Sequence, residues 1–256
     1  MNIRKSIMEE ERVFPTLFAS VTKRTYGCLF YHEKNKESHD SNHAILYPDR
    51  IKEFENMVVD IKSFYHEKGI TPRIYQPDAD GYFAKHKQIL ESHGFTIEHY
   101  GKNKFMLLSD NNRIQSPKRL NINRIYEWDE RIARDIYLPA EEEYIIEVVK
   151  SSLKNSRYYL FAGFLDDEIA ALISFHTSEK GCTRFDYIET APKHRNNGYA
   201  KEILSDTTGF CRENGIQNCF LWPAHQASEH ICYQAGFRIL FETEAASAVC
   251  GSIQKD

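Results

Sequence analysis

The sequence lacks the features that would place it among zinc-binding, membrane-spanning or nucleic-acid-binding proteins. Its six cysteines are scattered and none forms a C-x-x-C pair, so we expect no metal site. No run approaches the roughly 18 apolar residues of a membrane span. Positive charge is not in excess either. A net charge of -4 and a pI near 6.3 argue against a general nucleic-acid binder.

The first residues also lack the apolar stretch of a secretory signal. Met1–Lys5 lead into the acidic run Glu9–Glu11. Because the cysteines show no disulfide pattern, we expect free thiols in a soluble protein of the reducing cytoplasm. Hydrophobic residues make up 41% and charged residues 27%, which is typical of a folded protein. A length of 256 residues accommodates two small domains.

A weak internal repeat divides the chain. Phe64–Ile70 aligns without gaps on Phe210–Ile216, with four of seven positions identical. Further on, Ile89–Ile97 aligns on Ile231–Ile239, with four of nine identical. Two related α/β halves would produce this pattern, and so would chance similarity between two helix–strand units. Both interpretations stay open on the sequence alone.

Each copy predicts the same order of elements. A helix ends at Gly-Ile, a short strand follows at Arg73–Tyr75 or Cys219–Trp222, and a second helix stops at Gly-Phe before a further strand. The polar segment Ser109–Lys118 is the best linker candidate. We therefore expect domains at residues 1–115 and 119–256. The polar stretch Glu33–Asp40 indicates a solvated hairpin loop.

The C-terminal half has a clear alternation of strands and helices. The expected elements are a strand at Leu120–Ile125, two helices within residues 128–154 separated near Pro139, a β-hairpin of Tyr158–Phe164 and Ile169–His176, a strand at Thr183–Thr190, and a helix from Gly198 to Asn214. The apolar face of that last helix comprises Ala200, Ile203, Leu204, Thr207 and Cys211.

The loop before this helix carries the most informative motif. It reads Arg195-x-x-Gly198-x-Ala200 and connects a strand to a helix start. Unpaired amides at a helix N-terminus carry partial positive charge and suit a phosphate or diphosphate. Gly198 lets the backbone approach the anion, and Arg195 and Lys201 add positive charge. The loop therefore predicts an anion-binding site.

With these residues in place, the sequence resembles the GNAT superfamily of N-acetyltransferases. The loop matches that family's (Gln/Arg)-x-x-Gly-x-(Gly/Ala) signature, and Thr190-Ala191-Pro192 stands where the family has Val-x-Pro. A second signature, a helix ending in Tyr and Gly-Phe, matches Ile231–Phe237. The resemblance covers roughly residues 120 to 245. It implies an α/β (α+β) fold, with a mixed, mostly antiparallel sheet whose central strands splay, plus a related, smaller N-terminal α/β half.

The resemblance also implies a cosubstrate, acetyl-coenzyme A, and the residues that bind it. In this family the pantetheine arm inserts between two splayed strands, which would here be Thr183–Thr190 and Asn218–Trp222. Backbone groups of Ile188, Glu189 and Thr190 would bind the pantetheine and polarise the acetyl carbonyl. The phosphates would lie on the loop residues Arg195, Asn196, Asn197, Gly198, Tyr199, Ala200 and Lys201.

The catalytic residues implied are Tyr233 as general acid and Glu189 as general base. The family tyrosine usually lies four residues before the Gly of Gly-Phe, where this chain has Cys232, so a role in packing is open for Tyr233. Glu189 could equally be a strand-edge carboxylate. Weaker base candidates are Asp186 and His176. His225 either contacts the cofactor or simply starts a helix.

The N-terminal copy lacks the phosphate loop, since Ala44–Ile51 contains no glycine. We expect this half to be a degenerate GNAT-like domain that binds no cofactor and either completes the acceptor cleft or packs the sheet. Its aromatic residues Tyr75, Tyr82 and Phe83 could line that cleft or fill a core.

The sequence as a whole predicts an acyl-coenzyme A-dependent N-acetyltransferase that acetylates a primary amine of a small molecule or peptide by direct attack. The alternatives are a non-catalytic coenzyme A-binding sensor or scaffold, and a structural or interaction protein on the same frame. We expect no nucleic-acid or membrane partner. No acidic patch points to a particular acceptor, and the oligomeric state is open.

Overall fold

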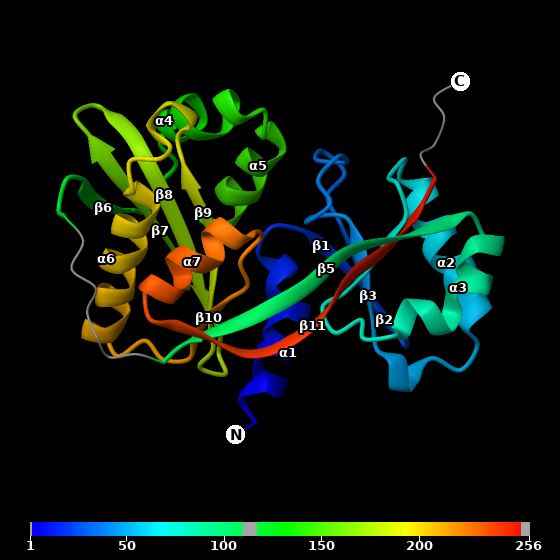
Figure 1. Cartoon of the computed structure of the whole chain (residues 1–256). Coiled ribbons are helices and arrows are strands. Elements are labelled where there is room, and N and C mark those ends of the chain that lie inside the picture. Colours follow the sequence, from blue (N-terminus) through cyan, green and yellow to red (C-terminus); the bar gives the residue numbers. More distant parts are fainter. Residues whose placement is uncertain (1, 110–116, 252–256) are drawn as a thin grey trace. The chain divides into compact units, whose positions relative to one another are not determined.

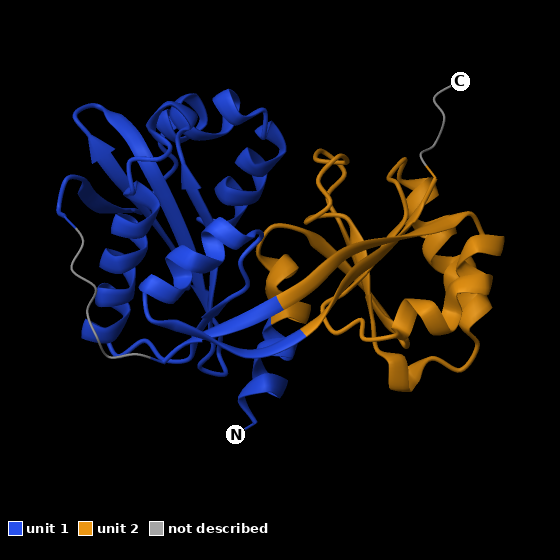
Figure 2. Cartoon of the chain, in the orientation of Figure 1, with its two compact units in different colours: residues 1–10, 104–242 blue, residues 11–103, 243–256 orange. Residues whose placement is uncertain are grey.

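The computed structural model describes residues 2–109 and 117–251 (Figure 1). The chain forms two compact units, of residues 1–10 and 104–242 (unit 1) and of residues 11–103 and 243–256 (unit 2) (Figure 2). These units differ from the expected ranges 1–115 and 119–256. The reason is that two long strands, β5 (Phe95–Leu108) and β11 (Phe237–Cys250), each begin in one unit and end in the other. Most of the expected linker, residues 110–116, lies outside the described residues.

Unit 1 has a sheet covered by helices. Its helical elements are α1 (Ile3–Val13, as far as residue 10), α4 (Glu130–Ile132), a π-helical turn (Ala133–Tyr137), 3-10 turns (Leu138–Ala140 and Pro192–His194), α5 (Glu143–Ser152), α6 (Tyr199–Glu213) and α7 (Gln226–Gln234). Its strands are β6 (Asn121–Ile125), β7 (Tyr158–Leu165), β8 (Glu168–Thr177), β9 (Thr183–Thr190) and β10 (Cys219–Leu221), with the end of β5. Strands β6 to β9 are antiparallel neighbours, β10 is parallel to β9, and β5 is antiparallel to β10.

Unit 2 repeats the order that unit 1 has from β7 to α7, which is three strands, a helix, a strand and a helix. It contains β1 (Ser20–Arg24), β2 (Gly27–Tyr31), β3 (His43–Leu46), α2 (Phe54–Glu67), β4 (Arg73–Gln76), α3 (Tyr82–Ser92), two 3-10 turns (Phe14–Leu17 and Pro48–Arg50) and the end of β11. Strands β1 to β3 are antiparallel, β3 is parallel to β4, and β4 is antiparallel to β11. The expectation of a mixed, mostly antiparallel sheet with a related N-terminal half is confirmed.

The repeat is visible in the way the helices end. Gly69 and Gly215 both adopt positive φ, at 64° and 67°. In each copy the following isoleucine amide donates back into the helix, Ile70 to Tyr65 at 2.9 Å and Ile216 to Cys211 at 2.8 Å. The two copies therefore share geometry as well as sequence at these helix ends.

The strands after these helices are exchanged between the copies. β5, which ends the first copy, pairs with β10 of the second, and β11, which ends the second copy, pairs with β4 of the first. The exchange follows directly from the length of the two strands, each of 14 residues.

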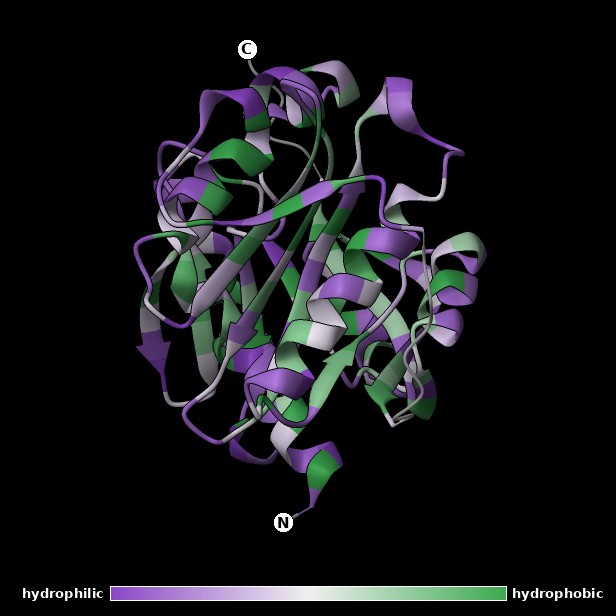
Figure 3. Cartoon of the chain, turned by 90° about the vertical axis from the view of Figure 1, so that its left-hand side faces the viewer, coloured by the Kyte–Doolittle hydropathy of each residue, from purple (hydrophilic) through white to green (hydrophobic). Residues whose placement is uncertain are grey.

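The core of unit 1 lies between α6 and the sheet. Ile203, Leu204 and Cys211 of α6 are fully buried and pack with Phe175 of β8 and Phe185 of β9. In Figure 3 hydrophobic residues lie on both strands and helices, and the connecting loops are largely hydrophilic. All six cysteines are buried and free. Across residues 2–109 and 117–251, no helix combines the length and apolar character needed to cross a membrane.

The stretch Glu33–Asp40 is the hairpin loop between β2 and β3, and most of its residues are exposed, as predicted. Asn35 and Ser38 are buried, and the Asn42 side-chain amide donates to both of their carbonyl oxygens at 2.8 Å. Phe83 is fully buried and belongs to the core of unit 2, and Tyr82 packs against that core.

Candidate functional site

Strands β9 and β10 separate soon after they meet. Their parallel pairing joins only Cys219 to Thr183 and Phe220 to Arg184, and β10 ends at Leu221. Strand β9 continues to Thr190 on the far side of this point. The edge of β9 that faced β10 is thus free of strand pairing in the described structure from Phe185 onward. This is the splay that the sequence predicts.

A β-bulge interrupts β9 beside the splay. Leu172 of β8 pairs with Glu189, and Ser174 pairs with Asp186, so one residue of β8 lies opposite two of β9. Tyr187 has a φ of 42° at this place. Bulges commonly redirect side chains and backbone next to functional sites. This one redirects the backbone of Ile188 and Glu189.

The loop after β9 is a rigid platform. The Asn197 side chain donates to the carbonyl oxygens of His194 and Arg195 at 3.1 and 3.2 Å. Arg119 donates to the Asn197 carbonyl oxygen at 2.6 Å. Asn196 and Gly198 adopt left-handed φ angles of 64° and 79°. The loop is therefore held in shape by its own hydrogen bonds and by one from Arg119.

The loop presents the start of α6 to solvent. Gly198 is the N-cap and no side chain caps the first amides. Arg195, Asn196 and Asn197 are exposed, whereas Ala200 and Lys201 are half-buried. Tyr199 is buried in the core, so only its backbone can contribute to a ligand. The residues fit a diphosphate, and their role in binding one stays a prediction.

The acidic side chain in the first turn of α6 has hydrogen-bond partners outside the helix. Glu202 is buried, and its carboxylate accepts from the backbone amides of Arg119 and Leu120 at 2.6 and 2.7 Å. It therefore holds the chain before β6 against α6.

Glu189 has the electrostatic environment of a base that works near neutral pH. Burial raises its pKa, the neighbouring carboxylate of Glu142 raises it further, and Arg195 opposes the rise, with a net pKa of about 7. No hydrogen bond or ion pair ties its carboxylate to another described residue. A carboxylate with a pKa near 7 suits proton transfer at neutral pH.

The weaker candidates each have a partner or a structural task. Asp186 forms an ion pair with Arg184 at 2.7 Å. His176 lies 2.7 Å from the carboxylate of Glu10, and both side chains are buried. His225 caps α7, because its ring accepts from the Ser228 amide in a reciprocal capping box. For His225 the helix-start interpretation is confirmed.

Tyr233 and Cys232 point in different directions from α7. Cys232 is buried in the core, and burial raises its pKa to about 12, so it stays a neutral thiol. Tyr233 is half-buried, and Lys104 of β5 is close enough to interact with it electrostatically. No described contact joins Tyr233 to Glu189. Its role as general acid stays a prediction.

The structure brings three further residues to this site that the sequence reasoning missed. Tyr137 interacts electrostatically with Tyr158, Glu189 and Glu142, and Glu142 also raises the pKa of Glu189. The only signal in the sequence was the break near Pro139, which shows that the chain turns there but not which side chains face the sheet.

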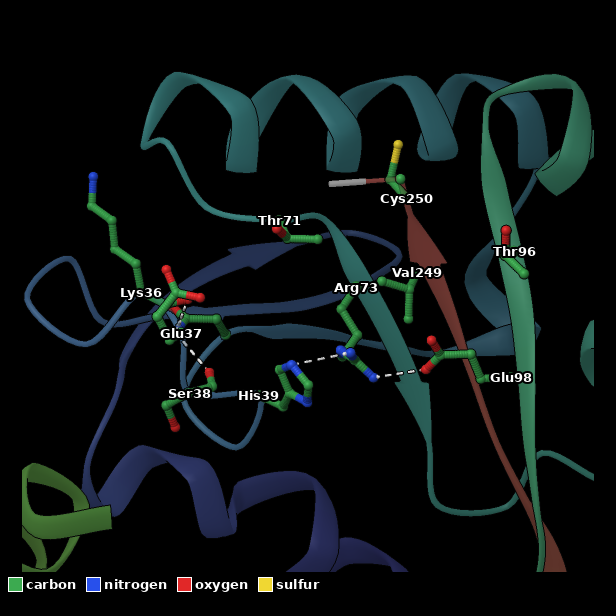
Figure 4. A pocket seen from close by; sticks show the side chains of 12 residues that line it. Lys36, Glu37, Ser38, His39, Thr71, Arg73, Thr96, Glu98, Val249 and Cys250 are labelled. Carbon is green, nitrogen blue, oxygen red and sulfur yellow. Dashed lines mark hydrogen bonds and ion pairs between the residues drawn. The ribbon is translucent and has the colours of Figure 1, made fainter. Parts of the chain in front are cut away.

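A separate pocket lies within unit 2. Its volume is about 360 Å³, and Figure 4 shows Arg73 at its centre. Arg73 forms an ion pair with Glu98 at 3.4 Å and donates to Ser247 at 3.1 Å, while His39 lies 3.3 Å from its guanidinium. Burial and the charge of Arg73 lower the pKa of His39, which favours the neutral ring. The pocket is polar, and Arg73 at its centre is paired with Glu98.

The splayed strands, bulge and glycine-capped helix define an acyltransferase-like α/β fold. The family model described as Acetyltransferase (GNAT) family matches residues 122–237. Residues 122–237 therefore carry a GNAT domain. No curated protein matches the chain.

Solved structures share the fold across both units. A functionally unknown conserved protein from Staphylococcus epidermidis is 10% identical with a TM-score of 0.64, over 93% of this chain and 96% of that one. A GCN5-related N-acetyltransferase from Kribbella flavida is 13% identical with a TM-score of 0.63, over 98% and 96%. A tandem GNAT protein from the clavulanic acid biosynthesis pathway is 10% identical with a TM-score of 0.59, over 84% and 76%.

Proposed function

We propose that this protein is an N-acetyltransferase that uses acetyl-coenzyme A as cosubstrate and acetylates a primary amine of a small molecule or peptide. The observation that carries the proposal is the splay of β9 from β10 directly before the glycine-capped start of α6. The splay leaves backbone groups for an extended amide-containing arm, and the helix start supplies amides for a diphosphate. The two features lie on consecutive segments of one strand–loop–helix.

The residues of the loop hold the nucleotide end in this proposal. The first amides of α6 point at the diphosphate, and Gly198 allows the close approach because no side chain stands there. Arg195 and Lys201 contribute charge-assisted hydrogen bonds. The backbone of Ile188, Glu189 and Thr190 orients the thioester and polarises its carbonyl group.

Two side chains move protons. Glu189 accepts a proton from the substrate ammonium, and the neutral amine attacks the carbonyl carbon, so a C–N bond forms and the C–S bond breaks. Tyr233 donates a proton to the departing sulfur, and the excess proton on the amide nitrogen is released to solvent. No covalent enzyme intermediate is required.

Unit 2 binds no coenzyme A in this proposal, and two contacts support that. The buried Gln76 side chain accepts from the Leu46 amide at 2.9 Å, so a side chain of β4 occupies the backbone edge of β3 where the two strands diverge. The corresponding helix, α2, begins with Glu53 as N-cap and Glu55 in its first turn. Two carboxylates at a helix N-terminus oppose a phosphate.

The test is turnover of acetyl-coenzyme A with a panel of amines, followed by release of free thiol. Amine-dependent thiol release supports the proposal. Tight binding of coenzyme A without release with any amine would instead favour a non-catalytic sensor or scaffold. The absence of both would favour a structural or interaction protein.

A further inference from the structure

Two buried polar atoms without partners lie together in unit 1. The hydroxyl oxygen of Tyr137 and one carboxylate oxygen of Glu142 have no hydrogen-bond partner among the described residues, and the hydroxyl group of nearby Tyr158 interacts with the Ser174 side chain. Tyr137 is 0% exposed and Tyr158 is 4% exposed. Burying a polar atom without a partner costs free energy, and native proteins rarely keep several such atoms unless a ligand or water completes them.

These atoms share the face of the sheet that carries Glu189. Tyr159 stacks on Phe175 under α6, so its neighbour Tyr158 faces the opposite side. Along β8, Leu172 and Ser174 alternate with the α6-facing Ile173 and Phe175, and Leu172 is the register partner of Glu189. Residues directly opposite in an antiparallel pair share a face.

A tight turn places Glu142 beside Tyr137. The π-helical turn that ends at Tyr137 packs against β8. A 3-10 turn follows, Glu141 takes a left-handed φ of 60°, and the Glu142 amide donates to the Tyr137 carbonyl oxygen at 3.0 Å. The turn thus fixes one carboxylate next to the buried hydroxyl.

The local charge is negative. Among Asp186, Glu142 and Glu189, only Asp186 has an ion-pair partner within the described residues, which is Arg184. Glu142 and Glu189 are therefore two carboxylates on one wall, accompanied by hydroxyl groups that can donate or accept hydrogen bonds. Such a set recognises cations.

From this arrangement we propose that the acceptor carries a second cationic group besides the amine that reacts, and that Glu142 binds this second group. The inference rests on the proposed acetyl transfer at Glu189. Once Glu189 has taken the proton of the reacting ammonium, that amine is neutral and its product is a neutral amide. A single-charge substrate would then leave Glu142 partly buried and without a counterion, whereas a second ammonium keeps it paired throughout.

The experiment compares two acceptors of equal chain length, 1,4-diaminobutane and 1-aminobutane. With the wild-type protein we expect kcat/KM to be about 10- to 100-fold higher for the diamine, the value of one charged hydrogen bond. In Glu142→Gln this preference should fall to less than about threefold, mainly through a higher KM for the diamine. Glu143→Gln, the exposed neighbour, is the matched control and should keep the wild-type preference.

Binding separates this inference from the proposed function. Calorimetric titration of 1,4-diaminobutane with coenzyme A present should show at least about tenfold weaker binding in Glu142→Gln than in the wild type. Glu142-dependent binding without turnover would refute acetyl transfer and support the cation site. Equal kcat/KM for the two amines, or equal diamine binding by wild type and Glu142→Gln, would overturn the inference.

Discussion

At the scale of single residues, the proposed mechanism depends on the surroundings of one carboxylate, that of Glu189. Glu189 is placed by the bulge of β9 on a largely buried wall, near the negative charge of Glu142 and the positive charge of Arg195. Burial and like charge both favour its protonated form, and only Arg195 works against them. The same environment that makes ionisation costly makes the carboxylate a useful base near pH 7.

The pH dependence of kcat/KM follows from this. Glu189 accepts a proton only when ionised, so activity should rise tenfold per pH unit below about 7 and level off above it. Arg195→Gln removes the charge that lowers this pKa and should move the rise to higher pH, measured at saturating acetyl-coenzyme A with one acceptor. Lys193→Gln should leave the midpoint in place. A rise centred near the ordinary glutamate pKa would contradict the role of Glu189.

The general acid is tested by Tyr233→Phe. If Tyr233 protonates the leaving sulfur, kcat should fall on the order of a hundredfold, because only the hydroxyl is lost and the ring still packs against the core. Steady-state kinetics with a fixed amine measures the change, and unchanged coenzyme A affinity shows that the fold is intact. An unaltered kcat would assign Tyr233 to packing and leave the other roles standing.

At the scale of elements, the strand–loop–helix from Thr183 to Glu213 decides function. Its boundaries follow from local chemistry, since β9 matches the predicted range and Gly198 caps the predicted helix. The break near Pro139 and the hairpin of β7 and β8 were predicted for the same reason. The conformational preferences of proline and glycine, and the alternation of polar and apolar residues along a strand, act over a few residues. A single sequence is therefore sufficient to predict their effects.

Other features of the site depend on contacts between distant segments. The bulge at Tyr187 arises from the register between β8 and β9, which no local pattern records. The interaction of Glu142 with Glu189 requires the π-helical turn that ends at Tyr137 to pack on β8. These features could not be predicted from spacing, because the residues become neighbours only in the folded sheet.

The two ends of α6 provide a matched test of the loop. Gly198→Glu should weaken coenzyme A binding at least about a hundredfold, because a carboxylate would stand where the diphosphate is expected. Gly215→Glu introduces the same side chain at a glycine of similar positive φ at the C-terminal end of the helix. That control should lose stability but retain affinity. Isothermal titration measures both, and equal affinities in the two variants would refute the loop as the phosphate site.

At the scale of the whole molecule, the exchange of β5 and β11 makes each unit depend on the complete chain. β10 pairs with β5, whose residues precede the GNAT domain, and β4 pairs with β11 at the far end of the sequence. The repeat predicts two similar halves, but it does not reveal this exchange. The order of strands along the chain is the same whether the last strand of each half pairs within its own half or with the other half.

Fragments should therefore behave unlike ordinary domains. We expect residues 119–256 expressed alone to aggregate, because β10 loses its neighbour and exposes an edge. Coexpression with residues 1–115 should restore a soluble complex, since both exchanged pairings can then form. Size-exclusion chromatography of the two preparations measures the outcome. A monomeric, folded and coenzyme A-binding 119–256 fragment would show that β5 is dispensable.

The central claim is that one helix start in unit 1 holds a diphosphate while the related position in unit 2, closed by Gln76 and faced by Glu53, does not. The most direct measurement is calorimetric titration of the intact chain with acetyl-coenzyme A and with coenzyme A. The account predicts one bound molecule per chain for each ligand. Two bound molecules would contradict the assignment of unit 2, and no detectable binding of either ligand would contradict the enzymatic account itself.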